Sequence, residues 1–156
     1  MNIRHFLPIL FLAIVSCNEP EHGALDPETM SKKLFDAIKN DAADKTALLL
    51  PDKGTYRKIE EENGHQYTDL NAAYEQFENN ANANLTAVRG RVSDWSTATF
   101  SRAHYTESKL GKVPTARVTT KFDADGQPRK VEFTAAKFNN RWYYYGDVVW
   151  IDKVAD

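Results

Sequence analysis

The apolar residues of this chain follow a helical period in its first half and a strand-like period in its second half. Between residues 27 and 38 they recur at every third or fourth position, as Met30, Leu34, Phe35 and Ile38. This spacing predicts an amphipathic helix. Asp26 suits the N-cap position of that helix, because its carboxylate can accept hydrogen bonds from the free backbone N–H groups of the first turn.

Two further helices are predicted before the period changes. A short helix carries the sequence DKTALLL and ends before Pro51, because proline disfavours helical backbone at the preceding residue. A longer helix runs from about residue 68 to residue 88 and ends at Gly90. Its apolar face comprises Leu70, Ala73, Tyr74, Phe77, Ala81, Leu85 and Val88. Residues 51–66 contain two glycines and the charged run RKIEEENG, which indicate a loop or a ragged hairpin.

From Ser93 onward, apolar and polar residues alternate, which is the pattern of β-strands. Four strands are expected, in the segments WSTATFSRAHYTE, TARVTTKFD, RKVEFTAAKF and NNRWYYYGDVVWI. Helices that come first and strands that follow as consecutive hairpins predict an α+β fold. We expect N-terminal helices packed on one face of a curved four-stranded antiparallel meander.

One dipeptide sets the expected register of the second and third strands. Asp125–Gly126 is a favoured two-residue hairpin loop. With this loop, Val118 lies opposite Phe133, and the apolar faces of the two strands coincide. One face of the sheet is therefore expected to be buried.

The last strand is apolar on both sides. With Asn139–Asn140 as its hairpin loop, Val131 lies opposite Val148, and the strand adds four residues to the buried face: Trp142, Tyr144, Val148 and Trp150. Tyr143 and Tyr145 then point to the other face. Such a strand is usually covered on its second face by the chain's own tail, a helix or another molecule. We therefore predict Tyr143 and Tyr145 as residues of a partner surface.

The composition fits one globular domain. The chain has 156 residues, of which 42% are hydrophobic, and this is enough to bury a core. The formal net charge is −2, whereas a nucleic-acid-binding domain presents a strongly basic face. Nucleic acid is therefore not an expected partner.

The N-terminal segment MNIRHFLPILFLAIVS has the layout of a secretory signal, with Arg4 before an apolar run that ends in a small residue. Cys17, which follows it, is the only cysteine of the chain. The residues IVSC resemble the lipobox of bacterial lipoproteins, over the first seventeen residues. The resemblance implies that Cys17 is acylated and becomes the first residue of the mature protein. An ordinary secreted protein with a spare thiol is the alternative.

This resemblance implies an organisation and a location. Residues 1–16 are expected to be a lipoprotein signal peptide, residues 17–25 a lipidated cysteine with a polar tether, and residues 26–156 a single α+β domain. Glu19 and Glu21 resemble the surface-export signal of some Gram-negative lipoproteins. The expected location is the cell envelope of a Gram-negative bacterium, as an outer-membrane lipoprotein that faces the periplasm or the cell surface.

The order of the predicted elements resembles that of the nuclear-transport-factor-like and cystatin-like folds, which are cone-shaped. The resemblance rests on the element order, on the residues around LLLP and on the closing FNNRWYYYGDVVW. In that group the sheet curls around a helix and leaves an apolar pocket. Its members include isomerases, dehydratases, ligand binders and dimerisation modules, so that the resemblance implies a fold without settling a function.

No catalytic, metal-binding or cofactor motif is recognisable. His104 and Glu107 are three positions apart on a predicted strand, so they face opposite sides and cannot form a local metal pair. The segment DADG lacks the further oxygen ligands of a calcium loop and is typical of a hairpin turn. We therefore expect no enzymatic activity, no metal and no cofactor.

Three functions are compatible with these patterns. The leading hypothesis is a non-enzymatic protein-binding or scaffold module, anchored to the membrane, that meets another protein or a second copy of itself. The alternative is a small apolar ligand-binding protein, with a pocket between sheet and helices near Tyr74, Phe77, Phe100 and Trp150. The third is an enzyme of the isomerase or dehydratase type.

Overall fold

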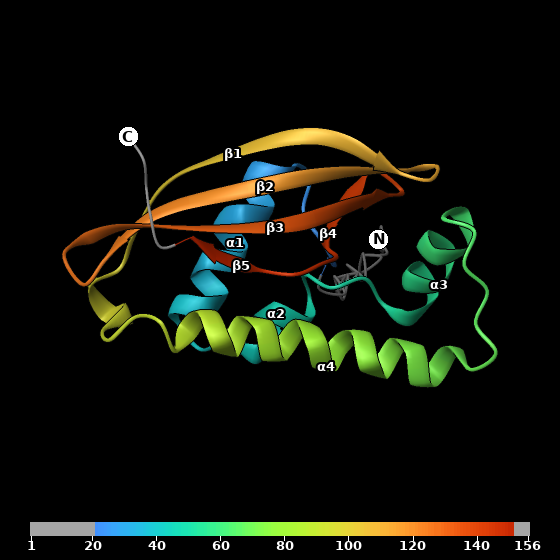
Figure 1. The fold of residues 1–156 in the computed structure, drawn as a ribbon, viewed down its shortest axis with the longest axis horizontal. Coiled ribbons are helices and arrows are strands. Elements are labelled where there is room, and N and C mark those ends of the chain that lie inside the picture. Colours follow the sequence, from blue (N-terminus) through green and yellow to red (C-terminus); the bar gives the residue numbers. More distant parts are fainter. Residues whose placement is uncertain (1–20, 152–156) are drawn as a thin grey trace, which may run out of the picture.

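The computed structural model describes residues 21–151. It confirms the α+β fold, with helices packed on a curved antiparallel sheet (Figure 1). Cys17 and the signal segment lie outside the described residues. The helices are α1 (Pro27–Lys39), α2 (Ala43–Ala47), α3 (Lys53–Glu62) and α4 (Leu70–Arg89).

After a 3₁₀ turn at Trp95–Thr97, the chain forms the strands of one sheet. They are β1 (Thr99–Leu110), β2 (Val113–Ala124), β3 (Gln127–Phe138), β4 (Arg141–Tyr144) and β5 (Val149–Ile151). The strand order is β1-β2-β3-β4, and β5 pairs with β3 next to β4. No helix in residues 21–151 has the length and hydropathy needed to cross a membrane.

Three of the helices begin with an aspartate N-cap. The side chains of Asp26, Asp52 and Asp69 accept hydrogen bonds from backbone N–H groups of α1, α3 and α4, at 2.7, 2.8 and 3.1 Å. The prediction of a loop over residues 51–66 is wrong, because α3 occupies most of this segment. Its cap at Asp52 and its buried residues Tyr56 and Ile59, three positions apart, explain why it is helical.

The register predicted for β2 and β3 is confirmed, since Val118 lies opposite Phe133. Two of the three loops of the meander are the predicted dipeptides. Asp125–Gly126 has φ values of 52° and 70°, and Asn139–Asn140 has 48° and 59°. Positive φ at both central residues is the signature of the type I′ turn, whose twist matches that of the flanking strands.

The last strand departs from its predicted register. Tyr144 lies opposite Ala135, as expected, but Val131 lies opposite Trp150 and not opposite Val148. The strand leaves β3 after Tyr144 and returns two residues late. Gly146 occupies this bend, and a Cβ atom on it would lie 3.2 Å from the Cβ of Thr134.

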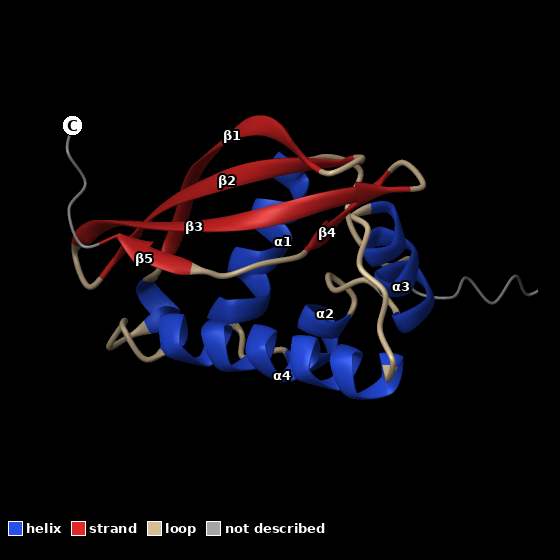
Figure 2. Ribbon diagram, turned by 45° about the vertical axis from the view of Figure 1, so that its right-hand side comes forward, coloured by secondary structure: helices blue, strands red, loops and turns tan. Residues whose placement is uncertain are grey.

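A shift of two residues preserves the faces of a strand, because side chains alternate with a period of two. Trp142, Tyr144 and Trp150 therefore lie on the predicted face, where they join the main core. Helices α1 and α4 supply the other side of this core, and Figure 2 shows the sheet and the helices as two layers. At its centre, the hydroxyls of Ser31 in α1 and Thr120 in β2 share a buried hydrogen bond of 2.6 Å.

The opposite face of the sheet is covered at one end by α3. Ile59 of α3 packs against Val113 and Ala136, whose side chains point away from the main core. Tyr143 is 6% exposed, and Tyr145 packs against rings of α3 and α4. The prediction that Tyr143 and Tyr145 form a partner surface is therefore wrong, because the chain's own helices cover both rings.

Part of the predicted tether is bonded to the domain. The backbone of Ala24 exchanges two hydrogen bonds with Trp142 of β4, both of 2.8 Å, and the N–H of Gly23 donates to the carbonyl of Leu48 at 2.7 Å. Glu21 pairs with Arg141 at 2.5 Å. The segment 21–24 thus closes the free edge of β4.

Gly23 is required by this attachment. Its φ is +76°, and a Cβ atom there would lie 2.7 Å from the carbonyl oxygen of Trp142, whereas Gly64 has a similar φ of +84° with open space around it. We expect Gly64→Ala to lower the free energy of unfolding by about 1–2 kcal/mol through its backbone conformation alone. Gly23→Ala adds the clash, so its loss is expected to be larger. Urea denaturation of the two variants measures the difference, and equal losses would contradict the attachment.

Candidate functional site

The four residues predicted to line one pocket lie in two separate places. Tyr74 and Phe77 of α4 are neighbours, with ring centroids 6.2 Å apart. Phe100 and Trp150 pack instead against phenylalanine rings of the main core, at centroid distances of 5.7 and 5.9 Å. The structure therefore does not assemble these four side chains into a single binding pocket.

Tyr74 and Phe77 belong to an aromatic cluster between α3, α4 and the bend after β4. The ring of Tyr56 is its centre, with centroids of Phe77 and Tyr74 at 4.9 and 5.5 Å. The hydroxyl of Tyr74 donates to the carbonyl of Pro51 at 2.9 Å. Burial raises the pKa of Tyr74 above its ordinary value, and the neighbouring Glu78 raises it further. These rings fill the space between the helices, so they act as packing residues.

A buried carboxylate lies at the edge of this cluster. The side chain of Glu60 is 8% exposed. Its Oε2 atom accepts a hydrogen bond of 2.5 Å from the hydroxyl of Tyr67 and lies 2.7 Å from Nδ1 of His65. Burial and the hydrogen bond to Glu60 raise the pKa of Tyr67 well above its ordinary range. This hydroxyl therefore stays protonated and donates a hydrogen bond to the carboxylate.

This group of residues was not predicted, because Glu60 lies in the segment that was interpreted as a loop. A carboxylate bonded to a tyrosine is the contact that an isomerase-type site would need. Here, however, Tyr67 and His65 both contact the same oxygen of Glu60 and tie residues 65–67 back onto α3. Within residues 21–151, no three His, Cys, Asp or Glu side chains converge to hold a metal ion. The geometry is that of a structural clasp, which we call the Glu60 clasp.

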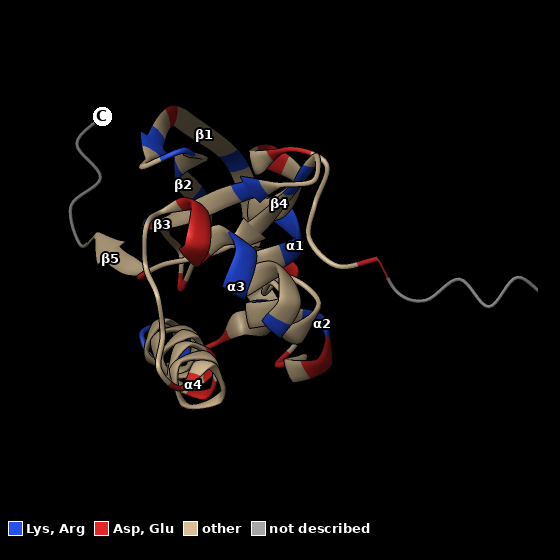
Figure 3. Ribbon diagram, turned by 90° about the vertical axis from the view of Figure 1, so that its right-hand side faces the viewer, with Lys and Arg blue, Asp and Glu red and all other residues tan. Residues whose placement is uncertain are grey.

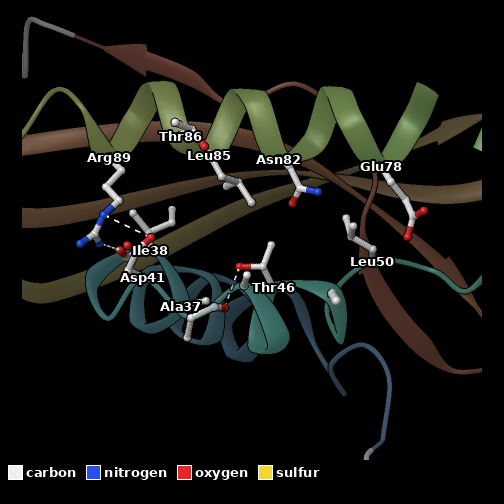
Figure 4. A pocket seen from close by; sticks show the side chains of 13 residues that line it. Ala37, Ile38, Asp41, Thr46, Leu50, Glu78, Asn82, Leu85, Thr86 and Arg89 are labelled. Carbon is white, nitrogen blue, oxygen red and sulfur yellow. Dashed lines mark hydrogen bonds and ion pairs between the residues drawn. The ribbon is translucent and has the colours of Figure 1, made fainter. Parts of the chain in front are cut away.

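A cleft lies between α1, α2 and α4, with a volume of about 260 Å³. Its lining combines small and branched apolar side chains with polar ones at the rim, as Figure 4 shows: Ala37, Ile38, Thr46, Leu50, Glu78, Asn82, Leu85 and Arg89. This cleft lies between helices, whereas the predicted pocket was expected between the helices and the sheet.

The only arginine in the lining of this cleft is engaged by its own protein. Arg89 donates to the carbonyls of Ile38 and Lys39 at the end of α1, and its Nε lies 3.4 Å from the carboxylate of Asp41. These contacts satisfy the C-terminal carbonyls of α1. The remaining rim charge is Glu78, so that the cleft offers one carboxylate above an apolar floor.

Strand β1 has a free edge along its whole length. It pairs with β2 from Thr99 to Leu110, and no other strand in residues 21–151 pairs with its outer side. Most of its side chains are exposed, including Tyr105 at 46%. A strand edge of this kind presents unpaired backbone N–H and C=O groups.

The other side of the sheet is less open. There β4 is closed by its two hydrogen bonds with Ala24, and β5 has only three residues.

Strand β1 has a register shift between Phe100 and Arg102, and it has charged side chains at Arg102, Glu107 and Lys109. Bulges and charges on an edge strand disfavour indiscriminate pairing. The β1 edge is therefore accessible, with features that disfavour indiscriminate pairing.

Comparison with known proteins gives no match to any family model, to any curated protein or to any solved structure. The similarity to nuclear-transport-factor-like and cystatin-like folds thus stays a prediction.

The Glu60 clasp predicts a stability effect without a loss of fold. Tyr67→Phe removes the hydroxyl that donates to Glu60 and is expected to lower the free energy of unfolding by about 1 kcal/mol, because Tyr67 is partly solvated. Tyr105→Phe is the matched control, since Tyr67 and Tyr105 are 42% and 46% exposed. Thermal or urea unfolding of both variants tests the clasp, and an unchanged stability of Tyr67→Phe would refute it.

Proposed function

We propose that this protein is a membrane-anchored lipoprotein of the Gram-negative cell envelope, acylated at Cys17, whose domain binds an extended segment of a partner protein along β1. The observation on which the binding role rests is the free edge of β1, twelve residues long. The domain acts without catalysis, as a binding or scaffold module.

Strand addition accounts for both affinity and selectivity at such an edge. An added strand gains backbone hydrogen bonds from the unpaired groups of β1, and pockets or charges for its alternate side chains select its sequence. Arg102 and Lys109 near the ends of β1 and Glu107 between them favour a partner segment with the complementary order of charges. The tyrosines that were expected to meet a partner are covered, which leaves β1 as the preferred surface.

The anchor is supported by the sequence alone. A positive N-terminal region, an apolar run, a small residue and Cys17 occur in the order that lipoprotein processing requires. Several acyl chains on one residue give stable attachment, since each buried methylene contributes about 0.8 kcal/mol. The outer membrane is the proposed location, on its periplasmic or its surface side.

The cleft between α2 and α4 supports a second candidate, the binding of a small ligand. Its apolar floor and the single carboxylate of Glu78 fit a compact apolar molecule with a cationic or hydrogen-bond-donating group. Such a ligand would protect the amides of α2 and α4 from hydrogen exchange and would leave those of β1 unchanged.

The anchor is tested by removing its thiol. Cys17→Ala is expected to abolish acylation and to release the protein from the membrane fraction, and globomycin is expected to block processing of the wild-type chain. Mass spectrometry of the mature N-terminus and fractionation of cells measure both effects. A Cys17→Ala protein that remained in the membrane would exclude a lipid anchor at this residue.

The β1 edge is tested with proline at two adjacent positions, Tyr105→Pro and Thr106→Pro. Neighbouring residues of a strand direct their N–H groups to opposite edges. One proline therefore breaks pairing with β2 and lowers the melting temperature, while the other removes an outward N–H at little cost to the fold. The stable variant is expected to lose the complex that wild-type protein forms in mild-detergent extracts, as seen on native gels.

Arg117→Ala is the control for this experiment, because Arg117 is exposed on the neighbouring strand β2 and has no place on the β1 edge. It is expected to retain the complex. Wild-type protein that migrates as a monomer, or a stable proline variant that keeps the complex, would contradict binding along β1.

A further inference from the structure

We propose that the acylated domain rests with one defined surface on the lipid headgroup layer, and that Leu25 contacts this layer. The surface is the root of the tether, formed by residues 21–25 and the parts of α1, α2 and β4 that surround them. This inference rests on the proposed acylation of Cys17 and adds the orientation of the domain. The surface faces the membrane to which the chain is anchored.

The N-terminal segment becomes fixed to the domain at Gly23. Gly23 and Ala24 are held by backbone hydrogen bonds to Leu48 and Trp142, between 2.7 and 2.8 Å long. Lys33 of α1 adds a hydrogen bond of 3.3 Å to the carbonyl of Gly23. Figure 3 shows that the described chain begins beside β4, α1 and α2. The effective tether therefore ends at Gly23 and not at Leu25.

The remaining tether is short compared with the diameter of the domain. From Cys17 to Gly23 there are 23 − 17 = 6 residue steps, which span at most about 21 Å when fully extended. A domain of this size has a radius of gyration of about 14 Å and hence a diameter of about 36 Å. The tether is shorter than the domain is wide, so it holds the attached side close to the membrane and keeps the opposite side away.

The side of the domain that carries the tether exposes an apolar side chain. Leu25 is 69% exposed, the highest value among the large hydrophobic side chains exposed in residues 21–151. Gly23, two residues before it, lines a surface depression together with Lys33, Lys45, Glu21 and Asp36. An exposed apolar side chain near two lysines suits a boundary at which acyl chains meet phosphate groups, and the carboxylate of Glu21 is paired with Arg141.

Lys33 and Lys45 also match the expected distance from the membrane. Electrostatic attraction to phosphate groups falls off within a Debye length, about 8 Å at physiological ionic strength. Cations at the tether root lie within reach of the headgroups when the tether is partly extended, whereas cations at the far end of the sheet do not. Charge and chain length therefore favour the same orientation.

The experiment uses the full acylated chain in vesicles of phosphatidylethanolamine and phosphatidylglycerol that contain a nickel-chelating lipid. A spin label is attached to Leu25→Cys or, as the matched control, to Gln127→Cys. Gln127 is exposed and lies ten residues along β3 from Lys137, the partner of Trp142, which corresponds to about 33 Å. Because an acylated Cys17 has no free thiol, the introduced cysteine is the only one that reacts.

The nickel lipid is expected to accelerate the relaxation of the label at position 25 severalfold more than that of the label at position 127. Equal relaxation at both positions in vesicle-bound protein, or a stronger effect at position 127, would overturn the proposed orientation. A partner protein that covers the tether root in place of lipid would give the same negative result.

A failure of the anchor is recognised separately. In that case, the protein does not float with the vesicles, and the chain without an introduced cysteine takes up label at Cys17. The orientation and the acylation are thus refuted by different observations.

Discussion

Strand β3 pairs with three other strands, and the two turns at its ends decide which of its side chains face α1. Asp125–Gly126 and Asn139–Asn140 both adopt positive φ values, which the twist of two-residue hairpins requires. Because a slip of one residue would send every apolar side chain to the solvent, these turns fix the buried face of β2, β3 and β4 together. The packing of the helices depends on this register, because the buried hydrogen bond between Ser31 of α1 and Thr120 of β2 requires Thr120 to face α1.

The same register forces the last strand to bury both of its faces. Tyr144 enters the main core, while its neighbour Tyr143 points to the other side, where Asp52 and Thr55 at the start of α3 lie near it. The strand then leaves β3 at Gly146, which lies close against Thr134, and resumes two residues late. An even shift keeps Trp150 in the main core and lets Tyr145 pack against α3 and α4. Because of this bend, one continuous apolar segment contributes side chains to two separate cores.

Local signals predicted most of the fold, whereas contacts between distant segments were not predictable. Caps and apolar spacing identified α1 and α4, and turn dipeptides identified two of the three hairpins. Helix α3 was missed because charged residues separate Tyr56 from Ile59, and Ile59 packs against strands far along the chain. Alternation placed Tyr143 on the correct face but could not show that the chain's own α3 covers it. For the same reason, the apolar residues expected to share a pocket belong to two separate groups of aromatic rings.

The two edges of the sheet differ, because the N-terminal segment covers only one of them. Residues 21–24 close the β4 edge with backbone hydrogen bonds and an ion pair to Arg141, whereas the β1 edge has no such cover among residues 21–151. Three inter-strand spacings separate β1 from β4, a distance of about 14 Å. With the proposed anchor at Cys17, a tether that ends on β4 places the closed edge nearer to the membrane than the open one. The proposed extended partner would then reach β1 without displacing residues 21–24.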